Sequence, residues 1–213
     1  MPRIAGGLGM ILAVLMVAGC ETVLRGPSQV SVNWKFPQDQ MKSLGVMEFE
    51  WAPPELSLQE GISSGHVSDA GKMVSDMVAS ELLNLNRYEI RERSDLKRVL
   101  EEHELQLSDI MAKGDYRLIG EIAGVNGVVI GRVNLANLYA MGGLVKAEVS
   151  FTCRCVSTRT GDLVWSIGGD MAIDLAKMSP PHWLRMLAKE LVQELKGKLD
   201  HPPPGAQGAK SGG

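Results

Sequence analysis

The histidines and cysteines of this chain are its candidate metal ligands, and their spacing argues against a metal site. The chain has four histidines: His66, His103, His182 and His201. None has a second histidine or a cysteine at the short spacing that metal ligands adopt. In an extended strand, the Cα atoms of Cys153 and Cys155 would lie about 6.8 Å apart, at the upper edge of disulfide reach, with parallel side chains. The sequence therefore predicts two buried apolar thiols, and no metal or cofactor.

Three further motifs contain residue types used in catalysis or phosphate binding. Ser63-Ser64-Gly65-His66 places a hydroxyl near a base, but it lacks a nucleophile elbow and an evident third partner. Glu101-Glu102-His103-Glu104 is a charge run, which on a helix is typical of a solvated face. The pairs Gly142-Gly143 and Gly168-Gly169 have no phosphate-loop lysine and are typical of tight turns. We therefore predict no catalytic residue and no enzymatic activity.

The most specific chemical signal is Cys20, which follows an apolar run near the N-terminus. That run, residues 10–17, is shorter than the roughly 20 residues of a membrane-spanning helix and is typical of a secretory signal peptide. The residues behind it, Val17-Ala18-Gly19-Cys20, resemble the lipobox of bacterial lipoproteins, in which cleavage before the cysteine leaves a thiol that is acylated. We predict a signal peptide over residues 1–19, cleavage between Gly19 and Cys20, and lipidation of Cys20.

A lipidated Cys20 would fix the cellular location of the protein. One acyl chain holds a protein only marginally, at about 0.8 kcal/mol per buried methylene, whereas a cysteine with three chains such as palmitate stays in the membrane. In lipoproteins of this class, an aspartate after the cysteine commonly favours the inner membrane, and here that residue is Glu21. We expect the outer membrane, with the protein facing the periplasm. The inner membrane is the alternative.

The composition is that of one globular domain with no bias toward nucleic acid. The 213 residues are 45% hydrophobic and 22% charged, which is enough apolar material for one core. Lysine and arginine number 22 against 25 aspartates and glutamates, so there is no basic excess to neutralise phosphates. We expect a single folded domain and no nucleic-acid partner.

Composition also divides the chain behind the signal peptide into three parts. Residues 20–41 contain two prolines and no sustained period, so they are predicted to be a tether with a short strand near Val30–Trp34. Residues 42–199 contain the periodic segments and are predicted to form one periplasmic α/β domain. Residues 200–213 are rich in proline and glycine and are predicted to be a disordered tail.

Hydrophobic periodicity within the domain predicts a mixed sheet with helices packed on it. Strands are expected over residues 42–49, 87–93, 128–133, 145–156 and 163–167. Helices are expected over residues 67–85, 94–100, 115–123 and 180–199. Gly124 is expected to end the third helix, and the leucine stripe of the last helix is typical of a core. The fold class is therefore α/β, with four to five strands in the order β-α-β-α-α-β-β-β-α.

Five sequence segments follow one another behind the lipobox in an arrangement found in a known superfamily. They are Gly45–Phe49, Arg87–Leu96, Ile119–Gly120, Gly124–Gly131 and Thr160–Ser166. The chain from about Leu44 to Trp165 thereby resembles the curli assembly and transport (CsgG-like) lipoproteins, which include activators of penicillin-binding proteins of the LpoB kind. The resemblance implies a scaffold rather than a reaction. It implies a non-enzymatic outer-membrane lipoprotein that acts as scaffold, activator or assembly factor for an envelope complex.

The alternative within this superfamily is a subunit of an oligomeric secretion pore. Channel members add two β-hairpins per subunit, and a spanning hairpin needs about 20 residues or more. The two segments that could hold one, residues 132–146 and 167–178, are shorter. We therefore favour the scaffold. The sequence leaves open whether the protein forms a homo-oligomer and which envelope protein it binds.

Overall fold

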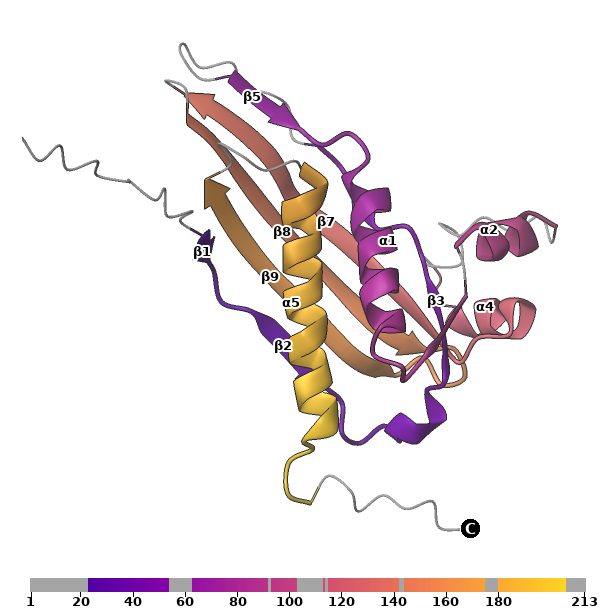
Figure 1. The fold of residues 1–213 in the computed structure, drawn as a ribbon. Coiled ribbons are helices and arrows are strands. Elements are labelled where there is room, and N and C mark those ends of the chain that lie inside the picture. Colours follow the sequence, from indigo (N-terminus) through magenta and orange to yellow (C-terminus); the bar gives the residue numbers. More distant parts are fainter. Residues whose placement is uncertain are drawn as a thin grey trace, which may run out of the picture.

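Three long antiparallel strands form the centre of the sheet in the computed structural model (Figure 1). The structure describes residues 23–53, 63–91, 93–102, 113, 115–141, 144–174 and 180–205. The long strands are β7 (Gly127–Met141), β8 (Leu144–Ser157) and β9 (Leu163–Asp174). In β8, alternate residues from Ala147 to Cys155 are buried, which confirms the alternation expected over residues 145–156.

Shorter strands extend this centre on both sides. They are β1 (Val23–Arg25), β2 (Gln29–Val32), β3 (Ser43–Val46), β4 (Glu50–Trp51), β5 (Ser63–His66) and β6 (Glu89–Arg91). β1 and β2 pair with β9, while β3, β4 and β5 pair with β7. β6 pairs in parallel with β3, at the far edge.

Two long helices, α1 (Ala70–Leu83) and α5 (Pro180–Asp200), cover one face of the sheet (Figure 1). The predicted stripe of α5 is buried there: Leu184, Leu187, Leu191, Leu195 and Leu199. This core also contains two fully buried indoles, Trp165 of β9 and Trp183 of α5. None of the helices in the described ranges is both long and apolar enough to cross a membrane.

Two shorter helices, α2 (Arg93–Glu102) and α4 (Tyr116–Ala123), pack at the other side of the sheet. Neighbouring residues of a strand point to opposite faces, and in β7 Val129 belongs to the large core while Ile130 belongs to the cluster under α4. α4 ends at Gly124, which has a φ of 65° as predicted. α2 begins at Arg93, one residue before the predicted Ser94.

The sheet is larger than the four to five strands predicted, with nine strands in the described part of the chain. The predicted order is present as β3, α1, β6, α2, α4, β7, β8, β9 and α5. Of the additional strands, β2 lies where a short strand was expected near Val30–Trp34. The other three, β1, β4 and β5, are two to four residues long, too short for alternation to reveal them. From Val23 onward, the predicted tether contains β1, β2 and the short 3-10 helix η1 (Gln38–Gln40), and it buries Val30, Phe36 and Met41.

Candidate functional site: an open polar face of the sheet

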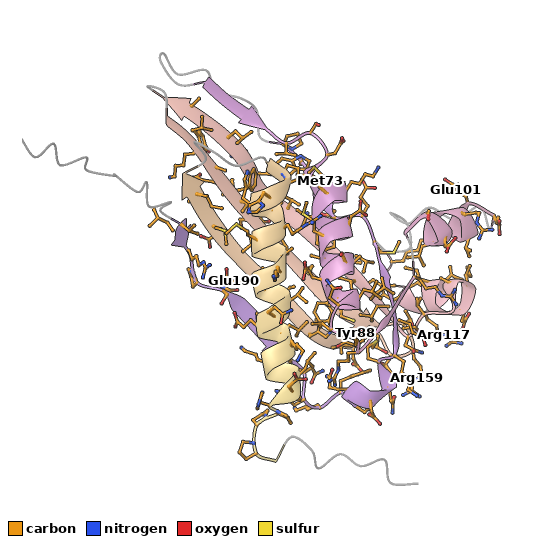
Figure 2. All side chains as sticks on the ribbon, in the orientation of Figure 1. Met73, Tyr88, Glu101, Arg117, Arg159 and Glu190 are labelled. Carbon is orange, nitrogen blue, oxygen red and sulfur yellow. The ribbon has the colours of Figure 1, made fainter. Side chains whose placement is uncertain are left out.

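The structure describes only some of the side chains singled out for metal or acid-base chemistry. His182 and His201 are exposed, and His103 and the side chain of His66 lie outside the described set. No group of metal ligands occurs among the residues that the structure describes. Glu101 and Glu102 are exposed on α2 (Figure 2), so the charge run has the solvated face expected of it.

Cys153 and Cys155 are buried and free, as predicted. Both lie on the face of β8 that packs beneath the two long helices. Burial raises the pKa of both thiols, and for Cys155 the neighbouring Cys153 raises it further. Because the thiolate is the reactive form of cysteine, this environment disfavours a nucleophilic or metal-binding role for both residues.

Two other sequence predictions have different outcomes. Gly168 and Gly169 were expected in a tight turn, but they lie inside β9, so that prediction is wrong. Their lack of side chains serves packing: a Cβ on Gly168 would lie 2.9 Å from Thr152, and one on Gly169 would lie 3.1 Å from Leu191. The predicted cleavage and lipidation residues, Gly19 and Cys20, lie outside the described residues and stay predictions.

The face of the sheet opposite α1 and α5 changes character halfway along its strands. In β7, Val128 and Ile130 pack under α4, whereas Arg132, two residues further on, is exposed. In β8, Val156 packs in the same cluster, whereas Arg154 is exposed. The change is offset by two residues between the strands, because Ile130, still in the apolar cluster, pairs with the exposed Arg154. The sequence thus places apolar residues where α2 and α4 cover the face and polar residues beyond them.

A shallow groove of about 500 Å³ lies on the part of this face that α2, α4 and the other described elements leave uncovered, which we call the open face. The open face is lined by side chains that can form hydrogen bonds, which are Gln29, Glu50, Arg132, Asn134, Thr152, Arg154 and Ser166. The Nε and Nη2 atoms of Arg132 donate to Oε2 of Glu50 at 2.9 and 2.6 Å. At the other side of the groove, the hydroxyl oxygens of Ser31 and Ser166 are 2.7 Å apart.

These groups are suited to binding rather than to proton transfer. The described lining contains no histidine, and its one carboxylate, Glu50, is engaged by Arg132. An acid-base mechanism needs a free base within reach of a second group, and the groove offers none among these residues. Guanidinium, amide and hydroxyl groups on a rigid sheet instead present fixed donors and acceptors to a polar partner.

A second hollow, of about 560 Å³, lies beside Tyr88, where the chain enters β6 (Figure 2). Burial, with a smaller effect of Cys155, raises the pKa of Tyr88 to about 12, and Arg87 and Trp165 oppose this shift. The hydroxyl has no hydrogen-bond partner among the described residues. At neutral pH it is therefore a protonated, structural group and not a base.

The open-face residues were not identified as a site from the sequence. Lys146, Glu148, Ser150, Thr152 and Arg154 were predicted as the polar side of a strand, and they are that side. A polar alternate face, however, is also typical of any solvated strand. What distinguishes this face is that α2 and α4 end halfway across it, and no local sequence pattern specifies where two helices stop covering a sheet.

The family match covers the first half of the sheet-forming chain, up to β7. Residues 31–136 match the family described as "Curli production assembly/transport component CsgG". This range runs from β2 through most of β7 and includes α1, α2 and α4. The chain belongs to the CsgG family. The resemblance expected from residues 44–165 is therefore confirmed.

The chain is also similar to several solved structures. Lipoprotein GNA1162 from Neisseria meningitidis is 15% identical, with a TM-score of 0.53 over 73% of this chain and 99% of that one. The PelC dodecamer from Paraburkholderia phytofirmans is 13% identical, with a TM-score of 0.48 over 83% and 97%. The LpoB C-terminal domain from Salmonella enterica is 13% identical, with a TM-score of 0.39 over 61% and 81%. No curated protein matches the chain. At this identity, the likeness to GNA1162 shows a common fold.

Proposed function

We propose that this CsgG-family protein is a non-enzymatic lipoprotein that is held at the outer membrane by the lipid on Cys20 and faces the periplasm. There it acts as a scaffold, activator or assembly factor for an envelope complex, and it docks a partner protein on the open face. The observation that carries the proposal is the half-covered sheet. One face packs under α1 and α5, whereas the other presents a groove of polar groups beyond α2 and α4.

Docking on this face would depend on oriented polar contacts rather than on buried hydrophobic area. The Glu50 carboxylate holds the Arg132 guanidinium in place, so its remaining donors point in a fixed direction. Arg154 adds a second exposed cation on the neighbouring strand, two residues from Thr152, which is the residue paired with Arg132. Because a lipid anchor confines the domain to a thin layer under the membrane, the effective concentration of nearby partners is high and weak polar contacts suffice.

Site-specific photo-crosslinking in intact cells tests the docking surface. A benzophenone amino acid at Thr152, exposed in the groove, is expected to crosslink to one discrete envelope protein. The same probe at Lys189, exposed on α5, is the matched control and should give no such product. Arg132→Glu should reduce the Thr152 product at least several-fold while leaving the fold intact. Equal crosslinking from both positions would contradict docking on the open face.

Membrane fractionation tests the anchor independently. Cys20→Ala removes the acylated thiol, so the chain should no longer be processed in a globomycin-sensitive manner or carry lipid by mass spectrometry. Cys153→Ala is the matched cysteine control, because its thiol is buried in the core and should leave processing unchanged. A Cys20→Ala chain that is processed and lipidated like the wild type would refute anchoring at this residue.

A further inference from the structure

The first strand of the sheet begins very close to the predicted anchor. Val23 starts β1, and Cys20 lies three residues before it. Three residues reach at most about 11 Å, so a lipid on Cys20 would hold β1 within that distance of the leaflet surface. β1 pairs antiparallel with β9, with Val23 opposite Ile173. β1 therefore begins at the end of the sheet where β9 finishes, and Cys20 is connected to the sheet at that end.

The β7–β8 hairpin ends on the same side of the sheet (Figure 1). One row of paired residues crosses the sheet at this level: Val23, Ile173, Ala147 and Leu138. Beyond this row, β7 continues three residues to Met141, and β8 starts three residues earlier, at Leu144. At about 3.4 Å per residue, the hairpin projects about 10 Å past the row. This projection equals the distance that Cys20 can reach from Val23.

The residues of this hairpin end suit an interface between water and lipid. The sequence from Leu138 to Val145 contains no charged side chain. Tyr139, Ala140 and Val145 are half-buried, and β5 pairs with β7 beside this end, with Ser63 opposite Ala140 and Ser64 opposite Tyr139. Tyrosine and lysine place an apolar body in lipid and a polar tip in water, and Lys146 follows the apolar run.

The neighbouring charges and apolar side chains fit the same environment. The Nζ atom of Lys146 lies 2.8 Å from Glu148, and Arg25 of β1 lies 3.1 Å from Glu190 of α5, so both cations are paired. Leu24, next to the predicted anchor, is 60% exposed. An exposed leucine on β1, a half-buried tyrosine on β7 and two paired cations thus occur on the strands that reach this end of the sheet.

We propose that the end of the β7–β8 hairpin is a second membrane contact, which rests in the headgroup region of the leaflet that carries the lipid of Cys20. This inference rests on the proposed anchoring. Two contacts fix the orientation of the domain, whereas a lipid alone leaves it free to tumble. The long strands then stand away from the bilayer, with the β8–β9 turn about 45 Å from it, since β8 has 14 residues. The open face stands side-on to the membrane, where a partner spanning the periplasm can reach it.

Spin-label accessibility of the full acylated chain in phosphatidylethanolamine and phosphatidylglycerol vesicles tests the contact. Single cysteines replace Ala140 at the hairpin end and Thr160 in the exposed β8–β9 turn, and the buried Cys153 and Cys155 stay unlabelled. The Ala140→Cys label is expected to collide several-fold more with oxygen than with a water-soluble nickel complex. The Thr160→Cys label should show the reverse. If both labels are equally open to nickel, the hairpin does not touch the membrane.

A charged variant separates this inference from the anchor. Tyr139→Asp should leave the acylated chain on floating vesicles but open the Ala140→Cys label to nickel several-fold. Thr152→Asp, on the open face, is the matched control and should leave the label protected, with circular dichroism showing both variants folded. Lipidation of Cys20 is checked by mass spectrometry in each sample. An unlipidated Cys20 refutes the proposed anchoring, whereas a lipidated chain whose label is open to nickel without Tyr139→Asp refutes only the hairpin contact.

Discussion

The hydroxyl of Tyr88 is buried without a hydrogen-bond partner among the described residues, and its pKa is raised to about 12, first by burial. A tyrosine in the unfolded chain has a pKa near 10. Between about pH 10 and 12, the unfolded state therefore loses a proton that the folded state keeps. Below pH 10, ionisation of Tyr88 does not lower the free energy of unfolding. Between about pH 10 and 12, it lowers the free energy of unfolding by about 1.4 kcal/mol per pH unit.

Replacing Tyr88 by phenylalanine isolates this effect. We expect the free energy of unfolding of Tyr88→Phe to lie within about 1 kcal/mol of the wild type at pH 8, because the lost hydroxyl had no partner. Above pH 10 the variant should become the more stable of the two. Urea unfolding at pH 8, 10 and 11 measures the difference. A parallel decline of both proteins would show that Tyr88 does not titrate differently on unfolding.

The thiols of Cys153 and Cys155 should be unreactive in the folded protein. Burial raises the pKa of both thiols, so at pH 8 each is protonated and shielded from solvent. A water-soluble disulfide reagent is expected to modify neither thiol in the native state and both in urea. Cys155→Ser, which places a hydroxyl in the core, should lower the free energy of unfolding by about 1–3 kcal/mol. Rapid native labelling would contradict the packing of β8.

At the scale of elements, two glycines should respond in opposite directions to the same substitution. Gly124 ends α4 with a φ of 65°, while Gly197 lies inside α5, and a Cβ at either position would meet open space. Gly124→Ala is expected to lower the free energy of unfolding by about 1 kcal/mol, because alanine disfavours this φ. Gly197→Ala should raise it by up to about 1 kcal/mol. Thermal and urea unfolding measure both, and equal signs would contradict the assigned backbone conformations.

Sequence patterns predicted the elements that are long enough to contain several repeats of the hydrophobic pattern of a strand or a helix. β8 has several buried-exposed alternations, and α5 has five leucines on one side, so both were predicted with their buried faces. β1 has three residues and β4 has two, and neither length contains a repeat. Gly168 and Gly169 were misassigned for a related reason, since their role depends on Thr152 and Leu191, which lie elsewhere in the sequence. Tertiary partners decide such positions, and local patterns do not contain them.

At the scale of the whole molecule, the candidate site arises from the relation between layers. Arg132 and Glu50 are far apart in sequence and ordinary as surface residues, yet β4 and β7 pair in parallel and bring them into contact. The open face exists because α2 and α4 cover only part of the sheet. Sequence reasoning predicted the family and the α/β fold class. The surface that we propose for docking required the packing of all layers.

The short distance between Cys20 and β1 leads to a prediction about the whole chain. A flexible insertion of about 20 Gly/Ser residues between Thr22 and Val23 has a mean span of about 25 Å, more than twice the reach of the native segment. The protein should fold and float with membranes as before. Its Thr152 crosslink to the partner should fall several-fold, because the domain no longer stands at a fixed height and orientation.

The matched control is the same insertion after Pro203, beyond α5, which leaves the anchor distance unchanged. Because Asp200 ends α5 at the opposite end of the sheet from β1 (Figure 1), this control adds equal length and flexibility far from the membrane. It should leave the Thr152 crosslink at the wild-type level. Equal loss from both insertions would mean that added flexible chain, rather than the height of the domain, disturbs docking. Unchanged crosslinking in both would mean that a partner reaches the open face at any height within the periplasm.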